Sequence, residues 1–294
     1  MVILAAPISY GQAVLLGLLQ GFSELFPISS LGQSVILPRV LGWNIHQNDK
    51  YFIAFLVATH LATAIVLLGF FWSDWVRILT GMWRSLVARE ISPSNPDGQL
   101  GWLIVVATIP AGILGLLLQD RLQSVFASAR SAAFFLILNG IMLFFAERLR
   151  RRAPGVPEGD DDGDHRIARR ATWRHAIGVG ASQAIALIPG FSRSGASMGG
   201  GLLVGFSNED AARFAFLLAT PIIGAAAILK IPILLGSDGN GVRGPALAAS
   251  LCSAVTAYLS VRFLMRYFET NRLTPFAAFC FVEGIVLTVW FAVS

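Results

Sequence analysis

Long stretches of the chain carry almost no charged residue, and they dominate the pattern of the sequence. Because about 20 consecutive apolar residues suffice to cross a bilayer, each such stretch predicts a transmembrane helix. The predicted spans cover residues 52–72, 100–119, 131–147, 211–233, 245–261 and 275–293. We therefore expect an all-α polytopic membrane protein.

Two further apolar segments are interrupted by proline, glycine and polar residues, and they predict something other than simple spans. They cover residues 12–40 and 176–206. Irregular backbone at membrane depth is tolerated only where protein or a water-filled cavity covers it. We therefore expect two re-entrant helix-turn-helix hairpins, which enter the membrane from opposite faces and meet at their tips near its middle.

The two halves of the chain resemble each other in three places, two in the spans and one in the interrupted segments. The matching pairs are "FLVATHLATAIVLL" (55–68) with "FLLATPIIGAAAIL" (216–229), "FLILNGIMLFF" (135–145) with "FCFVEGIVLTVW" (279–290), and "GLLQGFSELFPISSLGQS" (17–34) with "GASQAIALIPGFSRSGAS" (180–197). Each interrupted segment places a glutamine ahead of a proline and then a serine-rich turn. This pattern indicates a tandem duplication.

The duplication divides the chain into a first repeat at 1–147, a linker at 148–175 and a second repeat at 176–294. Each repeat would contain one hairpin and three spans. An odd number of crossings turns the second repeat upside down relative to the first. This is the inverted-repeat architecture of many transporters, whose sites lie near the membrane midplane.

Composition and charge predict the orientation. Only 13% of the residues are charged, whereas soluble domains carry roughly 25%. Arginines concentrate in segments 73–99 and 148–174, which the positive-inside rule places in the cytoplasm. The connection at 120–130 and both termini are then outside, and the acidic run at 153–164 predicts a flexible, solvated linker. Since the basic residues cluster beside the spans, the net charge of +5 does not indicate nucleic-acid binding.

The turn of the second hairpin, "PGFSRSGAS" at 189–197, holds an arginine within an apolar region. An arginine at membrane depth costs about 2.5–3.5 kcal/mol and is therefore a functional candidate. The guanidinium fork of Arg193 matches phosphate oxygens, and the helix N-terminus that follows favours an anion. Further donors come from Ser192, Ser194, Gly195 and Ser197. These features predict a phosphate-binding turn, and an ion pair with Glu24 that pins the two hairpins together is the alternative.

The first hairpin carries the complementary chemistry. Gln20 and Glu24 lie four residues apart and share a helical face. Pro27 ends that helix, and Ser29 and Ser30 follow at the tip. A carboxylate beside a hydroxyl and opposite an arginine suits an activated nucleophile, and Glu24 is also a candidate ligand for a divalent cation bridging to phosphate. The alternative role for the two serines is helix capping.

Among the histidines, His60 alone lies inside a predicted span. A polar residue there must face the bundle interior or a cavity. With a charge change near neutral pH, its imidazole is a candidate to steer Ser30 or to protonate a leaving phosphate. The alternative is a core histidine that is bonded to a backbone carbonyl.

The segments "QGFSELFPISSLGQ" and "PGFSRSGAS" resemble the two signature motifs of the bacterial undecaprenyl-pyrophosphate phosphatase family, the bacitracin-resistance type. The resemblance extends over essentially the whole chain. It implies a phosphatase of the bacterial inner membrane that removes the terminal phosphate of a polyprenyl pyrophosphate. The product is the monophosphate lipid that carries cell-wall glycans. The resemblance also implies a divalent metal, Mg²⁺ or Ca²⁺.

Mapped onto the family motifs, Gln20 and Glu24 occupy the acidic positions, Ser30 the hydroxyl position and Arg193 the phosphate clamp. Ser197 stands where the family has threonine, which keeps the hydroxyl. Gln33 stands where the family has histidine, so a mechanism that needs that histidine fails here. Relatives commonly have glutamine near position 60. The resemblance therefore suggests that glutamine and histidine have exchanged places, with Gln33 and His60 facing one cavity.

Three functions compete at this point: the pyrophosphatase, a transporter or flippase of polyprenyl phosphate, and a catalytically inactive homologue that binds the lipid carrier. The inverted repeat favours a transporter as strongly as an enzyme. The expected partners are the polyprenyl pyrophosphate and membrane lipids, with no nucleic acid and with a possible second copy of the chain in a homodimer.

Overall fold

The computed structural model describes residues 8–45, 49–126, 128–151 and 163–293, and within these ranges it contains helices but no strand. Among the described residues, six helices are long and apolar enough to cross a membrane. They are α3 (Lys50–Phe70), α5 (Pro96–Phe126), α6 (Ala129–Arg150), α10 (Asn208–Leu235), α11 (Arg243–Thr270) and α12 (Thr274–Val293). The prediction of an all-α polytopic membrane protein is thereby confirmed.

The two interrupted segments form pairs of shorter helices. The first pair is α1 (Tyr10–Ser23) and α2 (Ser30–Val40), and the second is α8 (Trp173–Ala184) and α9 (Arg193–Val204), with the single turn η1 (Ile185–Leu187) between them. These helices contain 11 to 14 residues, which is too few for one helix to cross the bilayer at a rise of about 1.5 Å per residue.

Two helices lie in segments that the charge pattern assigned to the cytoplasm. Helix α4 (Trp72–Ala88) is amphipathic, and α7 (Gly163–Arg170) follows the part of the linker outside the described residues. The sequence predicted a solvated run up to Asp164, but Asp164 is fully buried. Its carboxylate accepts hydrogen bonds from Arg77 of α4 at 2.8 Å and Arg213 of α10 at 2.6 Å. Burial is tolerated here because both carboxylate oxygens have charged partners.

Helices α6 and α12 pack against each other with a reciprocal pair of close approaches. A Cβ atom added at Gly140 of α6 would lie 2.7 Å from the carbonyl oxygen of Ala277, and one at Gly284 of α12 would lie 2.9 Å from that of Ala133. The two glycines occupy matching positions in the two halves, and so do the two alanines. Because the earlier residue of one helix faces the later residue of the other, the helices are antiparallel.

A second reciprocal contact involves the first helix of each hairpin. Gly17 of α1 lies against the backbone of Ala249 in α11, and Gly180 of α8 lies against the backbone of Ala107 in α5. Only glycine permits such an approach, because any side chain would overlap the neighbouring backbone. The first helix of each hairpin is therefore fixed on the second span of the opposite half.

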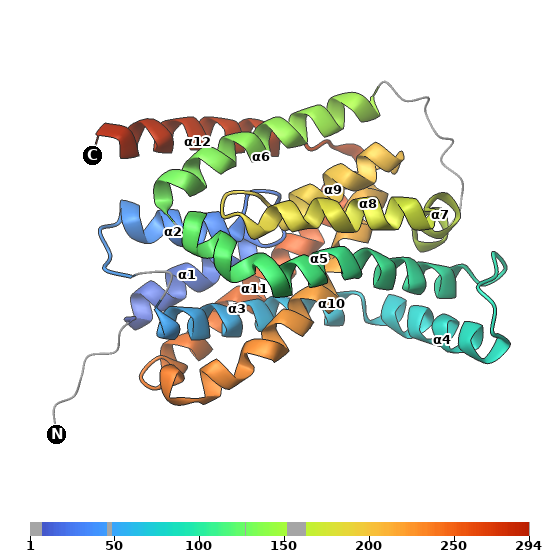
Figure 1. Cartoon of the computed structure of the whole chain (residues 1–294), viewed down its shortest axis with the longest axis horizontal. Helices are drawn as coiled ribbons and strands as arrows, with labels where there is room; N and C mark the ends of the chain where they lie inside the picture. Colours follow the sequence, from blue (N-terminus) through green and yellow to red (C-terminus); the bar gives the residue numbers. More distant parts are fainter. Residues whose placement is uncertain (1–7, 46–48, 127, 152–162, 294) are drawn as a thin grey trace.

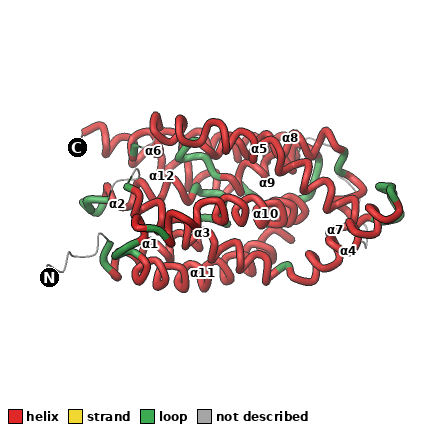
Figure 2. The backbone as a smooth tube through the Cα atoms, turned by 60° about the horizontal axis from the view of Figure 1, so that its bottom comes forward, coloured by secondary structure: helices red, strands yellow, loops and turns green. Residues whose placement is uncertain are grey.

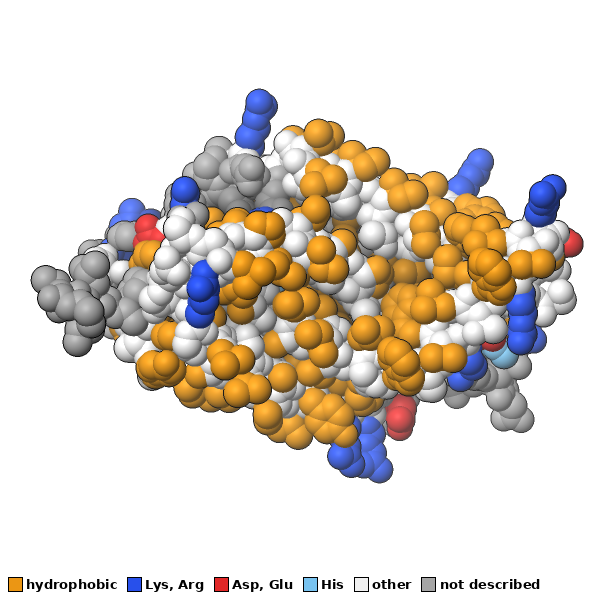
Figure 3. Space-filling model, turned by 90° about the horizontal axis from the view of Figure 1, so that it is seen from below, with side chains coloured by type: hydrophobic (Ala, Val, Ile, Leu, Met, Phe, Trp, Pro, Cys, Tyr) orange, Lys and Arg blue, Asp and Glu red, His pale blue; other side chains and the backbone are white. Residues whose placement is uncertain are grey.

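The helices run roughly along the long axis of the molecule (Figure 1). The start of α1 and the end of α12 lie at one end, and α4 and α7 lie at the other, as a second view also shows (Figure 2). Hydrophobic side chains predominate on the face in Figure 3, and Lys and Arg side chains project from its periphery. An apolar exterior of this kind is expected where lipid is the solvent.

Candidate active site

The turns of the two hairpins contact each other directly. The backbone N–H of Gly190 donates to Ser29 Oγ at 3.2 Å, and Ser194 Oγ donates to the carbonyl oxygen of Phe26 at 3.1 Å. Ser29, Ser194 and Gly190 are all buried. Two donors of the second turn thus bind two acceptors of the first, although the bonded residues are more than 160 positions apart in the chain.

Glu24 is the centre of the polar cluster at this junction, and only 6% of its surface is exposed. Its Oε2 accepts hydrogen bonds from Gln20 Nε2 at 2.9 Å and from Ser30 Oγ at 2.5 Å. Its Oε1 accepts from Arg193 Nη2 at 2.7 Å. The carboxylate therefore joins the hydroxyl of the first turn to the guanidinium of the second.

His60 reaches the same carboxylate from α3. Its Nδ1 donates to the carbonyl oxygen of Leu56 at 2.7 Å, and its Nε2 lies 3.4 Å from Glu24 Oε2. The two roles suggested by the sequence, a histidine bonded to the backbone and a histidine facing the site, therefore coexist. Because the bond to Leu56 fixes a proton on Nδ1, Nε2 is the atom that exchanges a proton with the cluster.

Arg193 uses only part of its hydrogen-bonding capacity. Nη2 is bonded to Glu24, whereas Nη1 is buried and has no hydrogen-bond partner in the described part of the chain. An unpaired buried donor of this kind is costly unless a ligand or water satisfies it. The guanidinium is therefore arranged to pin the hairpins together and to bind an additional oxygen.

The other predicted binding serines make internal hydrogen bonds. Ser29 is the N-cap of α2 and Ser192 the N-cap of α9, and each Oγ accepts the N–H of the glycine three residues later, at 3.1 Å in both turns. The glycine of the second turn is Gly195. Ser197 Oγ donates to the carbonyl oxygen of Arg193 at 2.9 Å. These hydroxyls stabilise the turns, and Ser30 alone of the predicted serines faces Glu24.

Gln33 is not directed at this cluster. Its Nε2 donates instead to Glu283 Oε2 on α12 at 2.9 Å. His60 contacts the Glu24 cluster but Gln33 does not, so the structure does not support the suggestion that both face one cavity. Tertiary packing places Glu283 beside α2, and its carboxylate is a stronger hydrogen-bond acceptor than a neutral group.

Two polar residues of the spans escaped the analysis of the sequence, namely Glu283 and Asn139. Glu283 carried a usable signal, because an ionisable residue within a span is a functional candidate by default. Asn139 in α6 is fully buried and contacts both turns. As one neutral amide among apolar residues, it gave no indication of its partners.

The predicted divalent cation has few protein ligands at this junction. Among the described residues, no group of three or more His, Cys, Asp and Glu side chains is placed to hold a metal ion. Glu24 is the only carboxylate in the cluster, and both its oxygens already accept hydrogen bonds. The donor set as arranged does not fit a metal site built from protein alone, so we derive no catalytic step from a metal.

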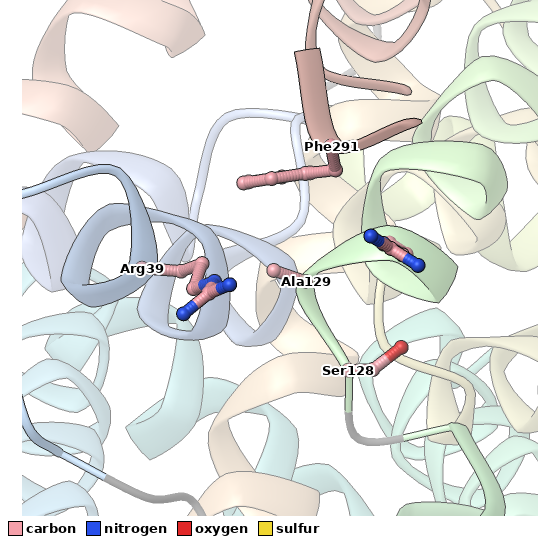
Figure 4. Close-up of a pocket in the computed structure, with 5 residues that line it drawn as sticks. Arg39, Ser128, Ala129 and Phe291 are labelled. Atoms are coloured by element: carbon pink, nitrogen blue, oxygen red, sulfur yellow. The ribbon is translucent and has the colours of Figure 1, made fainter. Parts of the chain in front are cut away.

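A separate hollow of about 280 Å³ lies at the end of the molecule where α2 ends and α6 begins. Arg39, Ser128, Ala129, Arg130 and Phe291 line it (Figure 4). Both arginines are exposed, and the described residues that line this hollow include no acidic side chain. No residue of the Glu24 cluster takes part in it, but α2 connects the two places.

Comparison with known proteins identifies the family of the chain. The family model described as bacitracin resistance protein BacA matches residues 13–286. The chain is 47% identical to the undecaprenyl-diphosphatase of Mycolicibacterium paratuberculosis, with 98% of this chain and 99% of that protein covered. It is 42% identical to the undecaprenyl-diphosphatase of Granulibacter bethesdensis, with 95% and 96% covered. The chain belongs to the bacitracin resistance protein BacA family.

Proposed function

We propose that this protein is an integral membrane phosphatase that hydrolyses undecaprenyl, or another polyprenyl, pyrophosphate to the monophosphate carrier lipid and phosphate. The names of the relatives support this activity. The observation that carries it is the pairing of Ser30 with Glu24 at 2.5 Å beside an arginine whose Nη1 is buried and free of protein partners. A hydroxyl, a base and a cation meet at one buried point, as phosphoryl transfer requires.

In the proposed reaction, Ser30 Oγ attacks the terminal phosphorus of the pyrophosphate. The bond from that phosphorus to the bridging oxygen breaks, and the polyprenyl monophosphate leaves with the bonding electrons. Glu24 Oε2 accepts the proton from Ser30 Oγ. Water then attacks the phosphoserine, which releases phosphate and restores the hydroxyl. Glu24 is suited to this task because the hydrogen bond to Ser30 already defines the path of the proton.

Arg193 and His60 serve the same reaction from the two other sides of the carboxylate. Arg193 Nη1 would bind a non-bridging oxygen of the terminal phosphate, where negative charge accumulates in the transition state. His60 Nε2, at 3.4 Å from Glu24 Oε2, would return a proton to the leaving phosphate. The bond from Nδ1 to Leu56 keeps the ring oriented for that transfer.

A divalent cation, Mg²⁺ or Ca²⁺, stays a prediction of the family resemblance. Such a cation at Glu24 would compete with Arg193 for the carboxylate and would take further ligands from the substrate's pyrophosphate, as Mg²⁺ commonly does. If the cation is needed, chelation lowers the rate and added Mg²⁺ or Ca²⁺ restores it, and the concentration required depends on the substrate concentration. If Glu24→Gln leaves the cation requirement unchanged, Glu24 is not the ligand.

We also propose that the chain is an inverted repeat in a bacterial inner membrane, with the termini outside and segments 73–99 and 148–174 in the cytoplasm. The reciprocal contacts of Gly140 and Gly284 support this, because an antiparallel pair of matching helices implies a twofold axis in the membrane plane.

Cysteine labelling tests the orientation. Asp161→Cys should react only from the cytoplasmic side and Ser294→Cys only from outside, although both positions lie outside the described residues. Reaction of both from one side would contradict the model.

The hollow at Arg39 and Arg130 supports access from the outer side. Arg39 lies nine residues after Ser30 in α2, which corresponds to about 13 Å along the helix. The two exposed cations at this hollow, Arg39 at the end of α2 and Arg130 at the start of α6, would attract the pyrophosphate from the lipid headgroup layer. The proposed role is the recycling of the lipid carrier for cell-wall synthesis, and resistance to bacitracin is the associated phenotype.

Phosphate release from a C55 polyprenyl pyrophosphate by the purified protein tests the proposal. We expect turnover with kcat in the usual range for enzymes, about 1–10³ s⁻¹, with Mg²⁺ or Ca²⁺ present. No release by a folded protein that still binds the lipid would favour the inactive homologue. Movement of polyprenyl phosphate across vesicles without hydrolysis would favour the flippase. A homodimer is a separate expectation, which the molar mass in detergent tests.

A further inference from the structure

Asn139 occupies the middle of α6 and has no exposed surface. Its Nδ2 donates a hydrogen bond to the carbonyl oxygen of Pro27 at 3.0 Å, and its Oδ1 accepts one from the backbone N–H of Ser192 at 3.0 Å. Pro27 belongs to the turn of the first hairpin and Ser192 to that of the second. One side-chain amide thus ties both turns to the same transmembrane helix.

The two backbone groups that Asn139 holds lie next to the reactive side chains. Pro27 stands between Glu24 and Ser30, and Ser192 directly precedes Arg193. Helix α6 packs against both α2 and α9, which begin at Ser30 and Arg193. Together with the direct hydrogen bonds between the turns, the amide therefore helps to fix how far the carboxylate and hydroxyl of one turn lie from the guanidinium of the other.

We propose that Asn139 is a positioning residue for phosphoryl transfer: it holds the Glu24–Ser30 pair and Arg193 at the separation that a terminal phosphate requires. This inference rests on the proposed function. Asn139 touches no reacting atom, so its influence is exerted through the two backbone groups it binds. A misplacement of about 1 Å between reacting groups is enough to lower a rate by about 10²-fold.

The chemistry of the contact requires an amide. Asn139 acts as donor and acceptor at the same time, and an aspartate would set a negative oxygen against the Pro27 carbonyl oxygen. A leucine of similar size would leave the buried Ser192 N–H unpaired, and the Pro27 carbonyl oxygen would keep only the weak Cys280 Sγ donor at 3.5 Å. The matching position of the second repeat is Glu283, whose carboxylate accepts a hydrogen bond from Gln33 of α2 rather than from either turn. The bridge between the turns is therefore specific to Asn139.

The test compares Asn139→Leu with Asn208→Leu in the purified full-length protein. Asn208 is a matched control, because it is also buried and its Nδ2 also donates to a backbone carbonyl oxygen, that of Asn271 at 2.9 Å. We expect both variants to lower the thermal midpoint in detergent. Asn139→Leu alone should lower kcat for the C55 pyrophosphate by about 10²-fold, with KM changed less than about threefold.

Two further measurements separate positioning from loss of stability. In an Arg193→Lys background, Asn139→Leu should lower kcat by less than about threefold. The reason is that the guanidinium that Asn139 is proposed to position is already absent. Amide hydrogen exchange of the segment containing Ser192 should become faster in Asn139→Leu and stay unchanged in Asn208→Leu. The proposal would be overturned if Asn139→Leu had the kcat of the wild type. It would also be overturned if Asn139→Leu lowered kcat by the same factor in the wild-type and Arg193→Lys backgrounds. If exchange at Ser192 becomes faster as expected but the wild-type protein shows no turnover, the Asn139 contact is real and the proposed function is wrong.

Discussion

The two hairpin turns share one construction. Each starts its second helix with a serine N-cap, Ser29 or Ser192, whose Oγ accepts the N–H of a glycine three residues on. In both hairpins a glycine of the first helix lies against the backbone of a span from the other half. The scaffold of the two turns is therefore nearly the same.

Their reactive positions differ completely. When 17–34 is paired with 180–197 residue by residue, Leu187 stands opposite Glu24 and Arg193 stands opposite Ser30. The first turn thus contributes the anion and the hydroxyl, and the second contributes the cation. Neither turn alone would form the site, because the carboxylate of one satisfies the guanidinium of the other at 2.7 Å. Two similar turns thus carry opposite charges, and removal of either partner would leave the other charge buried and uncompensated.

Replacing the hydroxyl of the first turn is the strongest test of this division. Ser30→Ala should lower phosphate release by more than about 10³-fold, because it removes the proposed nucleophile, while binding of the lipid stays within a few-fold of wild type. Single-turnover kinetics and lipid binding measure the two effects. Ser34→Ala is the control, since Ser34 lies one turn further along α2 and its Oγ donates to Leu31 O at 2.8 Å. Near-normal turnover of Ser30→Ala would assign the attack to a water assisted by Glu24.

Changing the cation of the second turn should have the next largest effect. Arg193→Lys keeps the charge but loses the fork that serves Glu24 and a phosphate oxygen together, so kcat should fall by about 10²-fold. Exposed Arg266→Lys on α11 is the control and should leave the rate unchanged. If Arg193→Lys is fully active, the second turn provides only a charge, and the bidentate role is wrong.

The sequence located the spans and the meeting of the turns, for identifiable reasons. The predicted span 52–72 corresponds to Lys50–Phe70, because an uncharged stretch of that length fixes a helix within two residues. The two interrupted segments were predicted to meet at their turns, and in the structure Gly190 donates to Ser29 and Arg193 pairs with Glu24. Helix α4 escaped prediction because Arg77 and Arg84 interrupt its apolar pattern, so that only one face of it is apolar.

The sequence missed those parts of the site that depend on which helices pack beside one another. Gln33 lies one turn after Ser30 in α2, but its side chain is directed to Glu283 on α12. No local pattern in either segment shows that α12 packs beside this face. The same holds for Asn139, whose two partners are backbone groups of segments far away in the chain.

His60 sharpens the comparison, because its equivalent in the second half is Pro221 and the site therefore receives an imidazole from one side only. His60→Gln should lower the rate by about 10²-fold, at the lower end of the 10²–10⁴-fold that general acid–base groups contribute. If Gln33 and His60 had exchanged places around one cavity, Gln33→His would restore part of that loss. Because Glu283 holds the side chain at position 33, we expect recovery only when Glu283→Gln is added. Rates of the single, double and triple variants test this. Unimpaired His60→Gln would remove the imidazole from the mechanism.

The smallest effect on the rate is expected for the two serine N-caps that the turns have in common. Ser29→Ala and Ser192→Ala each remove an N-cap and leave buried backbone donors unbonded: Ser29→Ala frees the N–H groups of Gly32 and Gly190, and Ser192→Ala frees the N–H of Gly195. Loss of such a cap costs about 1 kcal/mol, so both variants should lower the thermal midpoint by a similar few degrees. Their rates should fall less than about tenfold, far less than in Ser30→Ala, because their hydroxyls build the turns without reacting. A large loss of rate in Ser192→Ala with an unchanged midpoint would mean that this hydroxyl binds substrate, and the two turns would then share chemistry as well as construction.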